Sequence, residues 1–215
     1  MKFATLSLAL ILLLPPAISS AAEGGWKRVS QKDDMTLYVR DVDGSVADVR
    51  VEGRIDAPPE TVLAVLADVE AYKDTMPYTE VSKLMKRDGD RIWLYSVVNP
   101  PLASRRDYCV EIELSRDPDG VLSTEWKPAN ELAPPEKKGV VRVGVNDGSW
   151  RLEPVDGGRA TKATYRLHVD PGGSLPRWII EKTNRKSVPD AFKAVRKAAK
   201  SSRYADAPSP LAKAK

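Results

Sequence analysis

The sequence predicts an α+β fold in which a curved antiparallel sheet wraps around one long C-terminal helix. From Thr79 to Val169 the chain consists of short segments that alternate apolar and polar residues, separated by turns rich in Gly, Pro and Asp. This pattern is typical of consecutive antiparallel strands. A helix-forming stretch from about Leu175 to Ser201 then carries apolar residues at helical spacing. Because a sheet with one apolar face requires a cover, we expect this helix to pack across it.

The first 22 residues have the pattern of a secretory signal peptide. Lys2 supplies a positive charge, residues 3–14 form an apolar core, and Ser20-Ala21-Ala22 fits the small-x-small cleavage rule. The apolar core is shorter than the roughly 20 residues that cross a bilayer, which disfavours the alternative of a retained anchor. We therefore expect export to the periplasm and a mature chain that begins at Glu23.

The mature chain is expected to form one domain over residues 23–204. Residues 205–215 offer little apolar surface and are expected to be disordered. The full sequence has 34 basic and 30 acidic side chains, a balance too even for a nucleic-acid-binding protein. Its single cysteine, Cys109, excludes an internal disulfide and is expected to be buried on a strand.

Two strands and a short helix are expected before Thr79. Residues 35–40 alternate as in a half-buried strand, and residues 49–55 indicate the next one. Pro59 suits the first turn of a helix, whose apolar positions are Val62, Val65, Leu66 and Val69.

The later strands and the final helix follow from the same reasoning. A strand from Thr79 is followed by strands at residues 92–98, 108–114, 122–126, 141–145 and 163–169. Asn146-Asp147-Gly148 indicates a bulge or kink. The final helix is expected to bury one stripe, made of Leu175, Trp178, Ile179, Val188, Phe192, Val195 and Ala199.

The sequence lacks the residues that most kinds of catalysis require. The only imidazole, His168, alternates with apolar neighbours and is expected on the outer face of the sheet, which disfavours a hydrolytic triad. No Cys, His or carboxylate cluster has metal-ligand spacing, and no Gly-rich phosphate loop joins a strand to a helix. We expect no metal and no cofactor. Acid–base chemistry by carboxylates or tyrosines in a cavity stays open.

Three motifs in sequence order carry a family resemblance. Ser104-Arg105-Arg106-Asp107-Tyr108 opens a strand, Gly148-Ser149-Trp150 lies on a later strand, and Asp170-Pro171-Gly172-Gly173 turns into the final helix. Together they resemble the START (StAR-related lipid-transfer) family over roughly residues 30–200. The resemblance implies the helix-grip fold and a non-enzymatic carrier of a lipid or other apolar small molecule, held in a cavity between sheet and helix.

Two other functions stay open. The wider superfamily includes polyketide cyclases and aromatases that use the same cavity, so a cavity enzyme of that type is the main alternative. A binding module with a collapsed cavity is the third.

The expected cavity is lined by inward-facing side chains of the strands and the helix. Its apolar and aromatic members are Val110, Ile112, Trp126, Trp150, Tyr165, Leu167, Trp178 and Ile179. By the same resemblance, family members that carry sterols are expected to place a Glu and an Arg facing each other on two adjacent central strands. This chain has Leu94 or Tyr95 at the first of these positions and Ile112 at the second. We therefore expect polar points only at the hydroxyls of Tyr95, Thr124 and Tyr165.

The cavity also requires an opening. The resemblance places it at the loop with Pro100, Pro101 and Leu102, where Leu102 is expected to plug the mouth against the helix. It further implies that Arg106 and Asp107 form a structural ion pair at the start of their strand. Lys182, Arg185 and Lys186 are expected to hold the mouth at an anionic membrane surface.

Overall fold

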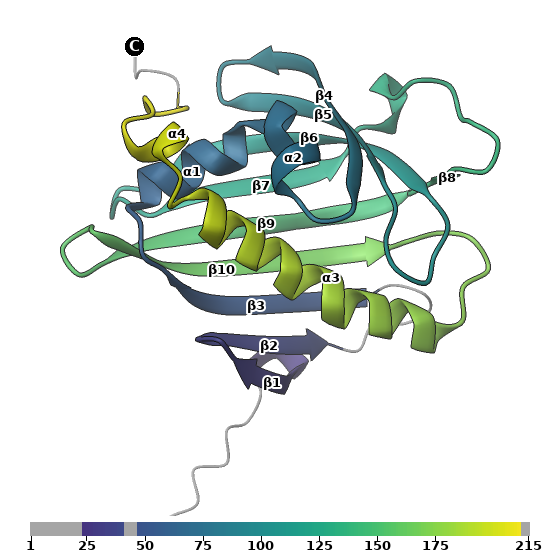
Figure 1. Cartoon of the computed structure of the whole chain (residues 1–215), viewed down its shortest axis with the longest axis horizontal. Helices are drawn as coiled ribbons and strands as arrows, with labels where there is room; N and C mark the ends of the chain where they lie inside the picture. Colours follow the sequence, from purple (N-terminus) through teal and green to yellow (C-terminus); the bar gives the residue numbers. More distant parts are fainter. Residues whose placement is uncertain (1–22, 41–46, 212–215) are drawn as a thin grey trace, which may run out of the picture.

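The structure is a computed structural model that describes residues 23–40 and 47–211. The predicted signal peptide, residues 1–22, lies outside the described residues. Ten strands form one sheet in the order β1-β2-β3-β10-β9-β7-β6-β5-β4, in which each neighbouring pair is antiparallel (Figure 1). The tenth, β8, pairs in parallel with the start of β6.

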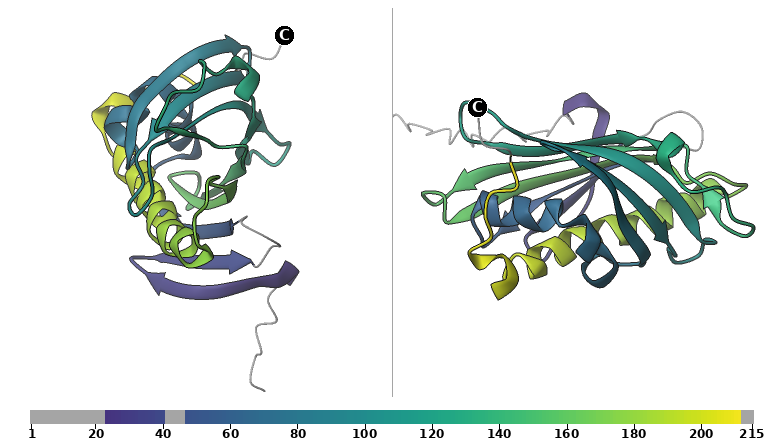
Figure 2. Two further views of the ribbon diagram at one scale, coloured as in Figure 1. Left: turned by 90° about the vertical axis from the view of Figure 1, so that its right-hand side faces the viewer. Right: turned by 90° about the horizontal axis from the view of Figure 1, so that it is seen from above.

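The strands have the following bounds: β1 Trp26–Lys32, β2 Met35–Arg40, β3 Ala47–Ile55, β4 Thr79–Asp88, β5 Arg91–Val98, β6 Arg106–Arg116, β7 Leu122–Pro128, β8 Val141–Arg142, β9 Val145–Val155 and β10 Ala160–Asp170. The helices are α1 Pro59–Ala67, α2 Tyr72–Thr75, α3 Arg177–Ala198 and α4 Ser202–Ala205, with short 3-10 turns η1 Glu23–Gly25, η2 Val69–Ala71 and η3 Asn130–Leu132. Figure 2 shows that the sheet is strongly curved and that α1 and α3 lie on its concave side. The predicted α+β class and the curved sheet around a C-terminal helix are confirmed.

The core lies between the concave face and these two helices. Phe192 and Val195 of α3 are fully buried, and Phe192 stacks on Trp150 with ring centroids 5.4 Å apart. Burying such side chains contributes about 1.5–3 kcal/mol each. The C-terminal half of α3 is thus fixed to the sheet by apolar packing.

The N-terminal half of α3 differs from the prediction. Its buried residues are Ile180 and Asn184, whereas Trp178 is 61% exposed and Ile179 is only half-buried. Ile179 lies nine positions before Val188, which is about two and a half turns at 3.6 residues per turn. It therefore points away from the face on which Val188 is buried.

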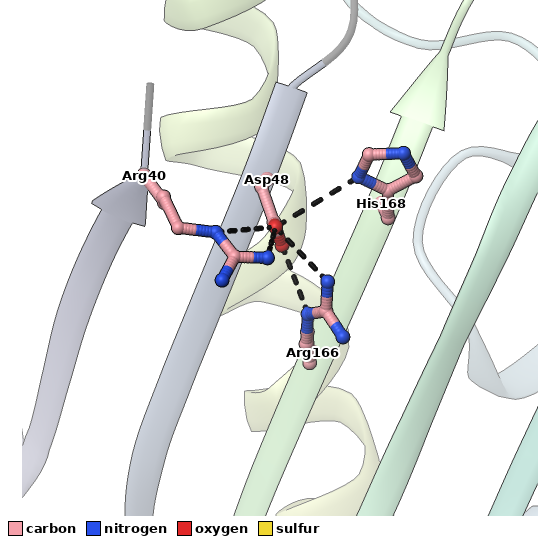
Figure 3. A network of polar contacts seen from close by, with 4 residues as sticks. All are labelled: Arg40, Asp48, Arg166 and His168. Carbon is pink, nitrogen blue, oxygen red and sulfur yellow. Dashed lines mark hydrogen bonds and ion pairs between the residues drawn. The ribbon is translucent and has the colours of Figure 1, made fainter. Parts of the chain in front are cut away.

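The convex face carries a charged network around Asp48 of β3 (Figure 3). Asp48 is almost fully buried and accepts hydrogen bonds from Arg40 Nε at 3.0 Å and from Arg166 Nε and Nη2, both at 3.0 Å. Burial would raise the pKa of Asp48, but the hydrogen bonds from Arg166 and Arg40 outweigh it and lower the pKa. His168 Nδ1 lies 3.8 Å from Asp48, on the outer face of β10 as predicted. The network ties β2, β3 and β10 together away from the core.

Two further expectations need correction. Of the tail predicted to be disordered, residues 205–211 are described and make contacts: Ala207 and Leu211 pack against the core, and Arg87 Nη2 donates to the Pro210 carbonyl at 2.5 Å. Residues 212–215 lie outside the described residues. Gly148 makes no bulge, because it pairs in register with both Leu167 and Trp126. A Cβ at Gly148 would collide with the Arg166 carbonyl and the Trp126 ring, so glycine is required by close approach.

Candidate ligand pocket

A pocket of about 250 Å³ lies between the concave face of the sheet and the N-terminal half of α3. Seven residues predicted from the sequence line it: Val110, Ile112, Thr124, Trp126, Trp150, Tyr165 and Leu167. They lie on β6, β7, β9 and β10, where alternate residues face the same side of the sheet. The polar alternation of these strands in the sequence therefore identified the inward face.

Other elements complete the pocket. Met76 lies just beyond α2, Leu94 and Val98 are on β5, and Ile180 and Val188 are on α3. The further lining residues are Leu66, Tyr72, Pro77, Tyr78, Thr79, Pro100, Ala103, Arg106, Tyr108, Val143, Asn146, Val169, Pro171, Leu175, Thr183, Asn184, Ser187 and Ala191. None of these residues was predicted as pocket lining, although Pro100 was predicted for the gate loop and Arg106 for a structural ion pair. Residues 92–97 of β5 are buried on both faces, so periodicity did not distinguish the inward-facing Leu94 from its neighbours.

Stacked aromatic rings form one wall. Trp150 and Tyr165 are neighbours in register on β9 and β10, and their rings stack with centroids 4.4 Å apart. The Trp126 ring lies 6.1 Å from that of Tyr165, and Trp126 Nε1 donates to Asn146 Oδ1 at 3.1 Å. These contacts fix the indole rings, so this wall is rigid and largely apolar.

Three predicted lining residues are not in the pocket. Tyr95 faces the convex side, where it joins a second small core with Trp93 and Cys109 and donates to Asp107 Oδ2 at 2.9 Å. Burial and this hydrogen bond raise its pKa to about 12. Trp178 and Ile179 lie outside the pocket because of the helix phase described above.

Arg106 and Asp107 do not pair with each other, contrary to the prediction. They are consecutive on β6, so their side chains point to opposite faces. Asp107 instead binds Arg142 of β8, with Arg142 Nε 2.7 Å from Oδ1 and Nη2 2.9 Å from Oδ2. Burial would raise the pKa of Asp107, but the hydrogen bonds from Arg142 and Tyr95 outweigh it, and the pKa is lowered.

Arg106 lies on the pocket side and is 3% exposed. Its Nε donates to the Pro171 carbonyl at 3.0 Å, Nη1 to the Ser104 carbonyl, and Nη2 to the Gly172 carbonyl at 3.4 Å. These contacts join the start of β6 to the turn before α3.

The predicted gate loop borders the pocket but does not plug it. Pro100 and Ala103 line the pocket, and Thr183 Oγ1 on α3 donates to the Pro101 carbonyl at 3.1 Å. Leu102 is 56% exposed and adopts a left-handed backbone conformation with φ of 66°. The loop thus contacts α3 through its backbone, while Leu102 points to solvent.

The pocket offers little acid–base chemistry. Burial raises the pKa of Tyr72, Tyr108 and Tyr165, so their hydroxyls stay protonated near neutral pH. Among residues 23–40 and 47–211, no histidine and no carboxylate lines the pocket. Within residues 23–40 and 47–211 no group of His, Cys, Asp or Glu side chains could hold a metal ion.

A sequence profile of the family described as "polyketide cyclase/dehydrase and lipid transport" matches residues 55–196. The chain belongs to this family. Among curated proteins, it is 31% identical over 156 residues to Uncharacterized protein PA1579 of Pseudomonas aeruginosa, covering 72% of this chain and 76% of the relative. It is 27% identical to phosphatidylcholine transfer protein of Rattus norvegicus, covering 86% of this chain and 87% of the relative.

Solved structures of START domains are similar to this chain, so the predicted resemblance to the START family is confirmed. A STAR-related lipid transfer protein fragment from Xanthomonas axonopodis superposes with a TM-score of 0.75 at 28% identity, covering 82% of this chain and 99% of that fragment. The Zhui aromatase/cyclase from Streptomyces sp. R1128 shares the fold, with a TM-score of 0.52 at 18% identity, covering 72% of this chain and 93% of that enzyme.

Proposed function

We propose that this START-family protein is an exported carrier that holds a lipid or similar apolar ligand in the pocket between the sheet and α3. The observation that carries the proposal is the lining, which combines aliphatic side chains with the stacked rings of Trp150 and Tyr165. Apolar ligand sites have this composition, with few polar groups. The likeness to proteins named for lipid transfer supports the same reading.

The lining favours a carrier over a cyclase-type enzyme. General acid–base catalysis is most effective when the pKa of the catalytic group lies near the working pH. Burial raises the pKa of Tyr72, Tyr108 and Tyr165 in the lining, which moves it further from neutral pH. We therefore expect a bound ligand to be released chemically unchanged.

Transfer requires contact with a membrane surface, and the gate end of the pocket suits it. Leu102 and Trp178 are two of the large exposed apolar side chains; Leu102 follows Pro101 in the gate loop, and Trp178 lies in the first turn of α3, five residues before Thr183. Lys182, Arg185 and Lys186 follow Trp178 on α3, and each could contribute about 1 kcal/mol of attraction to an anionic bilayer. No helix in the described ranges has the length and apolar character to span a bilayer.

Native mass spectrometry of the purified mature protein, followed by lipid extraction, tests the carrier function. We expect a stoichiometric apolar ligand in the wild type and its loss in Ala191→Trp, which places a large side chain in the pocket. Lys197→Trp adds the same side chain at an exposed position of α3 and should retain the ligand. Absence of ligand from the wild type, together with no uptake from added lipid, would refute the proposal.

Export is tested separately. Fractionation of cells that express the full chain should recover a periplasmic protein whose N-terminal residue is Glu23. A cytoplasmic protein that keeps residues 1–22 would contradict this part of the proposal.

A further inference from the structure

Arg106 is a buried cation without a buried anion beside it. Its hydrogen-bond partners are the carbonyls of Ser104, Pro171 and Gly172 and the Ser104 hydroxyl, and it forms no ion pair within the described part of the chain. Burial lowers the pKa of its guanidinium, which nevertheless keeps its charge. Carbonyl and hydroxyl oxygens accept four contacts from its five N–H donors, which leaves an N–H of Nη2 and one full positive charge at the edge of an apolar pocket.

The helix side of the same pocket has two polar groups without partners. Asn184 is 9% exposed, and its Nδ2 has no hydrogen-bond acceptor among the described residues. Ser187, one turn further along α3, lines the pocket as well, and its Oγ has no partner. An unsatisfied buried donor is costly, so its retention on the one face of α3 that meets the pocket points to a ligand group.

The remaining lining residues carry no charge. Its other polar members are tyrosines, threonines and an asparagine, Asn146, whose Oδ1 already accepts a hydrogen bond from Trp126. The nearest carboxylate along β6, Asp107, lies on the opposite face and is paired with Arg142. The pocket therefore combines one uncompensated positive charge with free donors.

From this arrangement we propose that the ligand ends in a single anionic group, a carboxylate or a phosphate, that is received by the Arg106 guanidinium and by the Asn184 amide and Ser187 hydroxyl of α3. The inference rests on the proposed carrier function, because it specifies the ligand of the same pocket. The apolar chain of the ligand then lies along the aromatic wall. The anion neutralises Arg106 and occupies donors that are otherwise unsatisfied.

Matched single-chain probes test this proposal. Binding of lauric acid is compared with that of methyl laurate, and dodecyl phosphate with dodecanol, by isothermal titration calorimetry on the full mature chain. We expect one acid to bind at least about tenfold more tightly than its neutral counterpart. The pair that shows the preference distinguishes a carboxylate ligand from a phosphate ligand.

Two variants locate the preference. Asn184→Leu should reduce the ratio of acid to neutral binding about tenfold while methyl laurate or dodecanol still binds. The melting temperature of its ligand-free form should equal or exceed that of the wild type, because an unpaired buried donor has been removed. Arg106→Gln should abolish the preference. If Arg106→Gln does not fold, Asn184→Leu decides. Arg159→Gln removes a charge from the exposed β9–β10 turn and should leave the ratio unchanged.

Each other result overturns the inference in a distinguishable way. Equal binding of acid and neutral probes in both pairs would refute the anionic ligand and leave the carrier function intact. An acid preference that survives in Asn184→Leu and in folded Arg106→Gln would place the anion elsewhere. Failure of all four probes to bind would count against the carrier function itself.

Discussion

The ion pair between Asp107 and Arg142 gives a stability prediction that the structure makes quantitative. Arg142→Met removes both hydrogen bonds to Asp107, at 2.7 and 2.9 Å, and the bond from Arg142 Nη2 to the Pro134 carbonyl at 2.8 Å. Asp107 is 1% exposed and keeps only the hydrogen bond from the Tyr95 hydroxyl among the side-chain donors of the described residues. Leaving a buried charge without its partner costs about 3–5 kcal/mol.

The lower end of that range applies, because the Arg142 side chain keeps some contact with solvent. In a domain of this size, about 3 kcal/mol corresponds to a melting temperature about 6–12 °C lower, measured by circular dichroism. Arg105→Met is the matched control, since Arg105 lies on the surface and pairs with Glu80 at 2.9 Å. Exposed pairs contribute at most about 1 kcal/mol, so this variant should melt close to the wild type.

The pH dependence provides a second check. In the wild type the lowered pKa of Asp107 contributes stability that is present above its unfolded value and is lost as the pH falls through the folded value. In Arg142→Met burial dominates and raises that pKa, so the penalty is present at neutral pH and disappears once Asp107 is protonated. The difference in melting temperature between the wild type and Arg142→Met should therefore become smaller as the pH is lowered from about 7 to about 4. The reasoning would be refuted if Arg142→Met and Arg105→Met lowered the melting temperature equally. It would also be refuted if the difference between the wild type and Arg142→Met did not change with pH.

Three further predictions concern the pocket and its mouth. Gly148→Ala should lower the melting temperature and shift the tryptophan emission, because the added Cβ displaces Trp126 or the Arg166 carbonyl; a stable variant with native emission would contradict the close packing. Trp178→Ser should weaken sedimentation with anionic vesicles, whereas Leu132→Ser, which also removes an exposed apolar side chain, should not; equal effects would place the membrane contact elsewhere. A disulfide between Pro101→Cys and Thr183→Cys should block ligand exchange in the oxidised protein alone, and equal rates in both redox states would move the opening away from this loop.

The strength of the sequence signal differed from strand to strand. On β6, charged residues such as Glu111 and Glu113 alternate with apolar ones, so the inward face could be assigned from the sequence. On β5, residues 92–97 are all buried, because η3 and its flanking loop cover the convex face there. A strand buried on both faces reads as a continuous apolar run, and its phase cannot be determined from periodicity. This is why Tyr95 was placed on the wrong side.

Non-local pairing accounts for most of the remaining differences. Residues 141–145 were expected to form one strand, but the strand is interrupted after Arg142, and β8 pairs in parallel with Arg106 and Asp107 of β6. That pairing brings Arg142 beside Asp107, and no local sequence pattern predicts it. β1 was missed because its residues are mostly polar and exposed, as an edge strand allows.

The error on α3 has a different origin, which bears on the function. Choosing the largest apolar residues of the N-terminal half favoured Trp178 and Ile179, yet the structure turns Thr183, Asn184 and Ser187 toward the sheet. Polar groups cannot close an apolar core without leaving donors unsatisfied, so a pocket persists where they face the sheet. The C-terminal half, with Phe192 and Val195, packs tightly and anchors the helix. The effect of a substitution should therefore depend on its position along α3: substitutions near Phe192 should lower stability, and substitutions near Asn184 should alter which ligand is bound.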